Sequence, residues 1–397
     1  MPELDFEIFD ADNHYYEATD AFTRHLDPAM ARRTMQWAEI NGRQRLLVGG
    51  KVCRFIPNPT FDPVARPGSL DDYFRGKVAA DDIRSAFGEL EPINPAYRDH
   101  DARLAVMDAQ RMAGCFMFPT LGVGMEEALV HDPEAAVAAF HAFNRWIDDD
   151  WGFAYHDRIF SAPYLSLVDL DAAVAELDWV LERGARVIVM RAGPVVSPAG
   201  GRSPGDPVFD PFWARIAEAG ITVAYHSGDA GDGRHAEEWG EPAEMEAFRR
   251  SAFRAVTTSD RRISDTIAAI ICHGVFARFP NVRVATIEAG SEWVGPLTKK
   301  LAKSWSQTPG LYPAGDPLEQ LRRHVWVSPY YEDDIVGLVG ILGADRVLFG
   351  SDWPHAEGLA DPSSFADDIA TLSADDTRLI MRENALALSR PQSFATV

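Results

Sequence analysis

Short apolar segments alternate with amphipathic helical segments along most of this chain, and that alternation strongly restricts the fold. Eight segments have the composition of buried strands: residues 6–11, 114–120, 158–165, 185–192, 221–226, 282–289, 324–331 and 345–352. Helical patterns lie between most of them, at residues 101–113, 133–152, 169–184, 211–220 and 264–279. Such units indicate an α/β fold whose parallel sheet is covered on both faces. Eight units favour a closed (β/α)8 barrel of the TIM type over an open doubly wound sheet.

One long segment, roughly residues 18–98, interrupts the alternation after the first strand. It contains a Gly-Gly hairpin signal at residues 49–50 and a proline-rich stretch at 55–68. A structureless loop of this length is improbable in a compact domain. We therefore expect a single barrel domain over residues 1–397, with an inserted subdomain that covers the barrel mouth. An inert insertion or a dimerisation arm is the alternative interpretation.

Four side chains of metal-ligating types stand at the ends of predicted strands. Asp12 and His14 end the first strand, His226 ends the fifth, and Asp352 ends the eighth. Residues two apart on a strand point to the same face, so Asp12 and His14 are able to reach one ion together. Catalytic groups of such barrels gather at the carboxyl ends of the strands. Mixed carboxylate and imidazole ligands suit a divalent transition metal, although each residue alone is more often a satisfied polar group at a strand end.

Composition limits the partners and the compartment. The chain has 60 acidic residues against 38 lysines and arginines, a net charge of −22, which repels nucleic acid and anionic membranes. No stretch approaches the roughly 20 apolar residues of a membrane span, and the acidic N-terminus lacks the pattern of a secretory signal. Three scattered cysteines indicate a reducing compartment. We expect a cytoplasmic protein whose partner is a small-molecule substrate.

Several motifs in the predicted barrel resemble the amidohydrolase-related family, which includes aminocarboxymuconate-semialdehyde decarboxylase. They are DADNHYYE at residues 10–17, FARFPNVRVATIEAGSEWV at 276–294 and FGSDWPH at 349–355, in that order. The resemblance implies a distorted (β/α)8 barrel with one catalytic divalent metal, usually in a homodimer. It also implies either hydrolysis or non-oxidative decarboxylation, because both reactions occur in the family. By position, Asp12, His14, His226 and Asp352 match the metal-site residues of the family.

Two departures from the family pattern affect the expected chemistry. The first motif is Asp12-x-His14 where the family often has two histidines. This oxygen-rich set slightly favours manganese, while zinc remains the commoner expectation. On the sixth strand, Glu288 stands where decarboxylases of the family place a histidine. Glu288 is a candidate general base or additional ligand, with a structural ion pair to Arg191 as the alternative.

The lysines bear on the number of metal ions. Binuclear members of the wider superfamily bridge two metals with a carboxylated lysine on the fourth strand. This chain has five lysines, and the fourth strand, residues 185–192, contains none of them. One metal ion per chain is therefore expected.

The main functional hypothesis is a metal-dependent hydrolase that uses metal-activated water. A bound divalent metal lowers the pKa of water toward about 7, and Asp352 is the first candidate to exchange the proton, with Glu288 as the second. Arg191 and His355 are candidates for substrate binding. The alternative is a decarboxylase of an aromatic or unsaturated carboxylic acid, and a metal-free binding protein is a third hypothesis.

Overall fold

The computed structural model describes residues 4–79, 83–197, 200–248, 251–258 and 260–392. Seven parallel strands form the inner wall in two sheets, ordered β1-β7-β8 and β14-β13-β12-β9. Their bounds are β1 Ile8–Tyr15, β7 Met112–Pro119, β8 Ile159–Ser161, β9 Val187–Arg191, β12 Thr222–His226, β13 Arg283–Ile287 and β14 Val325–Val327. Single parallel bridges complete the ring: Tyr164 with Val189, Val327 with Val347, and Trp353 with Asn13. The predicted (β/α)8 barrel is confirmed.

The eighth predicted strand, residues 345–352, differs from the other seven. Its first residues form a 3-10 turn, and Val347 makes one parallel bridge to β14. The Leu348 amide then donates to Val327 of β14, whereas the Phe349 amide donates to Ile380, outside the barrel wall. Because successive amides bond to different elements, the segment lies in the barrel wall without forming a regular ladder.

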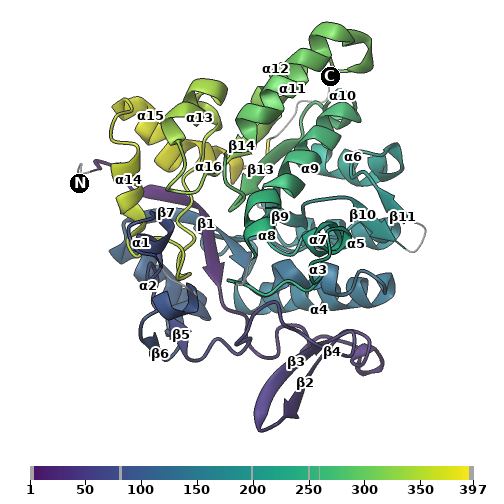
Figure 1. The fold of residues 1–397 in the computed structure, drawn as a ribbon, viewed down its shortest axis with the longest axis vertical. Coiled ribbons are helices and arrows are strands. Elements are labelled where there is room, and N and C mark those ends of the chain that lie inside the picture. Colours follow the sequence, from purple (N-terminus) through teal and green to yellow (C-terminus); the bar gives the residue numbers. More distant parts are fainter. Residues whose placement is uncertain (1–3, 80–82, 198–199, 249–250, 259, 393–397) are drawn as a thin grey trace.

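Helices surround the strands, and all five predicted helical segments are confirmed (Figure 1). Aspartate side chains cap the first turns of α2, α4 and α5, which satisfies amide groups that lack partners within the helix. The predicted helix over 264–279 is divided at Gly274, where φ is +74°. The helices are α2 His100–Ala109, α3 Met125–Ala128, α4 Pro133–Asp150, α5 Leu170–Glu182, α6 Asp210–Ala219, α7 Asp232–Glu238, α8 Ala252–Thr257, α9 Arg261–Cys272, α10 Val275–Arg278, α11 Val294–Gln307, α12 Pro317–His324, α13 Ile335–Leu342, α14 Phe365–Asp368, α15 Ala374–Arg378 and α16 Asn384–Leu388.

The segment between β1 and α2 forms small sheets of its own, described here except for residues 80–82. Its elements are β2 Met35–Ile40, β3 Arg43–Val48, β4 Lys51–Val52, β5 Val64–Ala65, α1 Asp71–Phe74 and β6 Leu90–Glu91. The antiparallel β2–β3 hairpin projects from the body of the molecule (Figure 1). The Gly-Gly signal falls at the turn between β3 and β4. A further small hairpin, β10 Val195–Ser197 and β11 Gly200–Arg202, follows β9.

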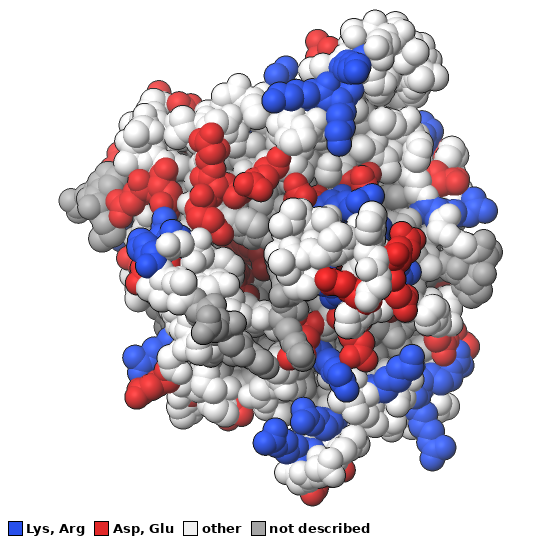
Figure 2. Space-filling model, in the orientation of Figure 1, with Lys and Arg blue, Asp and Glu red and all other residues white. Residues whose placement is uncertain are grey.

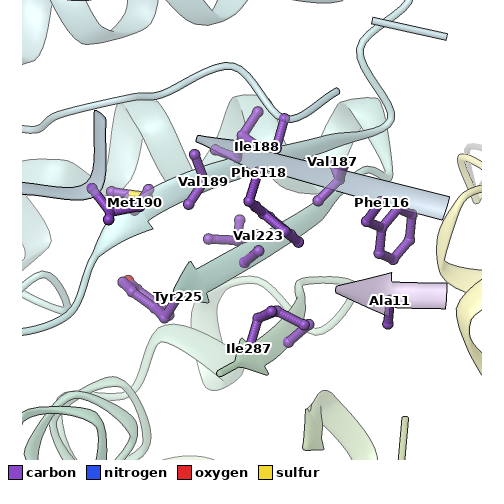
Figure 3. Packing of buried hydrophobic residues seen from close by; sticks show 14 of the residues in the cluster. Ala11, Phe116, Phe118, Val187, Ile188, Val189, Met190, Val223, Tyr225 and Ile287 are labelled. Carbon is purple, nitrogen blue, oxygen red and sulfur yellow. The ribbon is translucent and has the colours of Figure 1, made fainter. Parts of the chain in front are cut away.

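The hydrophobic core fills the barrel and the space under the helices. Figure 3 shows apolar side chains of the barrel strands, with Phe116 and Phe118 projecting from the same face of β7. This arrangement follows from the two-residue period of a strand. Both phenylalanines are fully buried, so the floor below the strand ends is apolar and closely packed.

Charge is unevenly distributed on the surface. In Figure 2, lysine and arginine side chains gather at the lower end of the drawn face, near β2 and β3, and at its upper end, over α11 and α12, whereas many acidic side chains lie between these two groups. No helix in the described part of the chain is long and apolar enough to cross a membrane.

Candidate metal centre

The first strand supplies two of the predicted ligands. Asp12 and His14 lie near the carboxyl end of β1, and both are almost fully buried. The pairing of β1 with β7 shifts register between Asp10 and Asn13, which marks a bulge in the part of the strand that carries the ligands. The His14 Nε2 atom lies 3.2 Å from the Asp12 Oδ1 atom. The two side chains therefore reach one point, as the sequence pattern predicted.

The fifth strand brings the second histidine to the same place. The Nε2 atom of His226 at the end of β12 lies 3.1 Å from His14 Nε2 and 3.4 Å from Asp12 Oδ1. The Nδ1 atom of His226 lies 2.7 Å from the carbonyl oxygen of Ser227. A carbonyl oxygen only accepts, so Nδ1 of His226 donates and its Nε2 carries the lone pair in the neutral ring. His226 therefore turns a metal-binding lone pair toward Asp12 and His14.

Two further carboxylates approach from residues with left-handed backbone. Glu288 follows β13 with φ of +50°, and Asp352 ends the eighth segment, residues 345–352, with φ of +55°. Glu288 Oε2 lies 3.4 Å from His226 Nε2, and Asp352 Oδ1 lies 3.4 Å from His14 Nε2. Non-glycine residues in this region cost free energy and are concentrated at functional sites.

The spacing of these donor atoms fits one divalent metal ion. Ligand atoms of Asp12, His14, His226 and Glu288 all lie within 4.8 Å of one another. Nitrogen and oxygen ligands at about 2.1 Å in a tetrahedral site are about 3.4 Å apart, close to the separations of 3.1–3.4 Å among Asp12, His14 and His226. The buried Nδ1 atom of His14 has no hydrogen-bond partner among the residues that the structure describes. Asp12, His14 and His226 thus form the centre of the candidate site, and the carboxylates of Glu288 and Asp352 both lie close to these three side chains.

The ionisation of the site reflects burial and mutual charge. Burial raises the pKa of Asp12, but the hydrogen bonds to His14 and His226 and the charges of those two rings together hold that pKa below its ordinary value. Burial, followed by the charge of Asp352, raises the pKa of Glu288 well above its usual range. Burial also raises the pKa of Asp352 well above its usual range. Carboxyl groups this close repel one another when ionised, and a divalent cation between them offsets that repulsion.

His355 lies against Asp352, on the loop that follows the eighth segment. Its Nδ1 atom is 2.5 Å from Asp352 Oδ1, and its Nε2 atom is 2.9 Å from the hydroxyl oxygen of Thr120. The ring centroids of His355 and His14 are 4.1 Å apart. The structure therefore places His355 beside the predicted ligands, within the same buried cluster.

Arg191 ends β9 with a nearly buried side chain and several partners. Its Nη1 atom lies 3.1 Å from Glu127 Oε2, and its Nε atom lies 3.5 Å from Glu126 Oε1. These carboxylates, rather than the predicted Glu288, are its ion-pair partners among the described residues. Arg191 and His226 both line one narrow pocket at this end of the barrel.

Two acidic residues at the site were not singled out from the sequence. Glu357 offers a carboxylate oxygen within 4.8 Å of those of Glu288 and Asp352. Asp10 is fully buried beneath the ligands and bonds to Ser351. The spacing of Asp10 and Asp12 on one strand was a usable signal for Asp10. Glu357 lies in a loop, where periodicity gives no signal.

Two comparisons, one with family models and one with solved structures, place this chain among known proteins. A family model described as Amidohydrolase matches residues 80–390, a range that begins after Asp12 and His14. The crystal structure of an amidohydrolase from Mycobacterium avium subsp. paratuberculosis is 46% identical, with a TM-score of 0.92 over 98% of this chain and 100% of that chain.

Two structures of decarboxylases share the fold at lower identity. A dihydroxybenzoic acid decarboxylase from Polaromonas sp., with bound manganese and the inhibitor 2-nitroresorcinol, is 16% identical, with a TM-score of 0.58 over 97% of each chain. A 5-carboxyvanillate decarboxylase from Novosphingobium aromaticivorans, complexed with manganese and 4-hydroxy-3-methoxy-5-nitrobenzoic acid, is 17% identical, with a TM-score of 0.55 over 98% of this chain and 97% of that chain.

Proposed function

This chain belongs to the amidohydrolase family, and on that basis we propose that it is a metal-dependent carboxy-lyase. In this proposal it removes CO2, without an oxidant, from a small aromatic or unsaturated carboxylic acid. The observation that carries the proposal is the convergence of two histidines and at least two carboxylates at the strand ends, with Asp12, His14 and His226 only 3.1–3.4 Å apart. The decarboxylase structures that share the fold support the choice of reaction.

We assign Asp12, His14, His226 and Asp352 as the residues that hold one divalent metal ion. When bound, such an ion supplies a Lewis acid that polarises oxygen atoms of the substrate and offsets negative charge. The buried positions of Asp12 and His14 keep the ligands fixed and water at the centre scarce. The donor set is compatible with both zinc and manganese, and manganese is the metal named for two structures of the same fold.

Asp352 and Glu288 are the proposed proton-transfer groups. In decarboxylation the bond between the substrate carbon and the carboxylate breaks, and its electron pair stays on that carbon. A carboxyl group then gives its proton to the carbon, and CO2 leaves. Asp352 is our first assignment because it contacts both His14 and His355, whereas Glu288, at the carboxyl end of β13, contacts His14 and His226.

We propose that Arg191 and His355 bind the substrate and that the segment between β1 and α2 covers the barrel mouth. The Gly68 amide donates to the His355 carbonyl at 3.2 Å, and the Leu70 amide donates to the Ala356 carbonyl at 2.8 Å. These bonds support the lid because they join the insertion to the loop that carries His355. The predicted homodimer and cytoplasmic location stay predictions.

Hydrolysis remains a second candidate because of how Arg191 is paired. A substrate carboxylate needs a cation, and Arg191 already neutralises Glu126 and Glu127. With Glu288 in the place of a histidine, the site is also rich in carboxylates. Both features favour an uncharged substrate, such as an amide, an ester or a lactone. A water molecule would attack this substrate, with Asp352 as the proton acceptor.

Isotope labelling separates the two reactions on any substrate that a screen identifies. Decarboxylation in heavy water places one deuterium on the carbon that carried the carboxylate and releases CO2. Hydrolysis in ¹⁸O-labelled water places labelled oxygen in the product and releases no CO2. A panel of hydroxybenzoates, unsaturated acids, esters, amides and lactones, assayed with zinc-loaded and manganese-loaded protein, tests the proposal. Labelled oxygen in the product without CO2 release would overturn the carboxy-lyase assignment.

A further inference from the structure

Asp10 is a fully buried carboxylate on β1, and the functions assigned above make no use of it. It lies two residues before Asp12 on the strand that carries the first two metal ligands. Burying a carboxylate is costly unless hydrogen bonds replace its contacts with water. The groups that donate hydrogen bonds to Asp10 therefore indicate its role.

Two of the hydrogen bonds of Asp10 lie within the ligand-bearing end of β1. Its Oδ1 atom accepts the Asp12 amide at 3.0 Å, and its Oδ2 atom accepts the side-chain amide of Asn13 at 2.9 Å. Asn13 in turn accepts a hydrogen bond from the buried Arg103, whose Nη2 atom also donates to the His14 carbonyl at 2.7 Å. These contacts hold β1 at its bulge, where the regular ladder to β7 is interrupted.

The other two hydrogen bonds of Asp10 cross to the eighth segment. The Ser351 amide donates to Asp10 Oδ1 at 2.9 Å, and the Ser351 hydroxyl donates to Asp10 Oδ2 at 2.5 Å. Ser351 immediately precedes Asp352, the ligand that the eighth segment carries. One carboxylate thus bonds to the backbone of one ligand, Asp12, and to the neighbour of another, Asp352.

This contact lies at a weak point of the barrel wall. Between β1 and residues 349–353, three backbone hydrogen bonds are present: Ala11 N–H to Phe349 O at 2.8 Å, Asp352 N–H to Asp12 O at 2.9 Å and His14 N–H to Trp353 O at 2.8 Å. Because no regular ladder fixes this seam, the side-chain bonds of Asp10 supply much of its hydrogen bonding. A change at Asp10 is therefore expected to alter the distance between the ligands on the two sides.

We propose that Asp10 is a positioning residue that sets the separation of Asp12 and Asp352 and so tunes the affinity of the metal centre. The inference rests on the metal site of the proposed function. Partners that orient metal ligands typically change metal affinity by about 10–100-fold when they are mutated. Asp10 acts through the backbone of its neighbours and touches neither the substrate nor the donor atoms at the centre of the site.

The test compares Asp10→Asn with wild type and with a matched control, Glu176→Gln. Both substitutions replace a mostly buried carboxylate with an amide of the same size. Glu176 lies on α5 and is bonded to Asn144 and Arg145 of α4, in the outer helix layer. Affinities for Zn²⁺ and for Mn²⁺ are measured by competition with a chromogenic chelator, and thermal unfolding of the metal-free proteins is followed alongside.

We expect the metal Kd of Asp10→Asn to rise at least about tenfold, while that of Glu176→Gln stays within threefold of wild type. A purely structural role for Asp10 would lower the unfolding temperature and leave Kd unchanged, and that result would overturn the inference. If Asp10→Asn does not fold, Ser351→Ala removes one of the two crossing side-chain contacts, and an unchanged Kd in that variant overturns it equally. Failure of wild type to bind either metal would contradict the proposed metal site itself.

Discussion

At the scale of single residues, the side chains of the site differ in the backbone that holds them. Asp12, His14 and His226 lie on strands: backbone ladders hold His14 and His226, and Asp12 lies in the bulge of β1. Glu288 and Asp352 lie just past their strands with positive φ. The strand residues are therefore suited to hold a metal ion in a fixed position. The carboxylates of Glu288 and Asp352, on left-handed backbone, are suited to transfer protons or to serve in turn as a metal ligand.

The variant Asp352→Asn should fold but lose activity by at least about a hundredfold. Asparagine keeps the size and one oxygen atom of the side chain, but it does not accept a proton at working pH, and proton-transfer groups contribute about 10²–10⁴-fold. Turnover and metal content are measured on the same sample. A variant that retains its metal and nearly full activity would move the proton-transfer role to Glu288, where Glu288→Gln provides the corresponding test.

The pair His226→Ala and His273→Ala tests which end of the barrel holds the metal. His226 Nε2 is 3.1 Å from His14 Nε2, whereas His273 caps the end of α9 and contacts the Ser203 hydroxyl at 2.6 Å. We expect His226→Ala to lose bound metal and His273→Ala to retain it, as measured by elemental analysis of dialysed protein. Equal loss in both variants would show that the ligands are wrongly assigned.

The sequence predicted which side chains meet at the candidate site, but not all of the contacts among them. Asp12, His14, His226 and Asp352 were identifiable because each is a polar residue that ends an apolar strand. The partners of Arg191 were not, since Glu126 and Glu127 lie beyond the end of another strand and have no periodic relation to it. Glu357 was missed for the same reason, because loop positions depend on tertiary packing.

At the scale of elements, seven of the eight predicted strands are regular and the eighth is not. Periodicity detects a buried apolar segment, but a ladder also requires both neighbours to be in register, and the amide of Phe349 bonds outside the barrel wall. The inserted segment was expected from its length, and its Gly-Gly signal marks the turn between β3 and β4. Its arrangement, with separate small sheets and a projecting β2–β3 hairpin, depends on contacts that no local pattern encodes.

The contact of the inserted segment with the loop after the eighth segment gives a stability prediction. A Cβ atom on Gly68 would lie 2.7 Å from the Ala360 amide nitrogen, whereas one on Gly76 would meet nothing within 4 Å. Both glycines have positive φ, +72° and +69°, so alanine costs about 1–2 kcal/mol at either position.

We therefore expect Gly68→Ala to lower the free energy of unfolding by at least about 1 kcal/mol more than Gly76→Ala, because only Gly68 is also overpacked. Urea unfolding of the two variants and wild type measures this difference in the free energy of unfolding. The dependence of that free energy on urea concentration is compared among the three proteins. Equal losses would show that the inserted segment does not pack closely against residue 360, and would weaken the proposed lid.

At the scale of the whole molecule, metal binding should stabilise a chain of high negative charge. The chain has a net charge of −22, and several of its carboxylates meet in one buried cluster. Free metal at one hundred times its Kd adds about 2.7 kcal/mol to the free energy of unfolding. We expect chelation to lower the unfolding temperature of wild type and to leave His226→Ala unchanged, as calorimetry with and without chelator would show.

The central claim is that one divalent metal ion is held by Asp12, His14, His226 and a carboxylate at the carboxyl ends of the barrel strands. Elemental analysis of wild-type protein, loaded with zinc or manganese and dialysed against metal-free buffer, tests it most directly. The account predicts one equivalent of metal per chain, because the donor atoms surround one point and the fourth strand lacks a bridging lysine. Two equivalents, or none after loading, would contradict it.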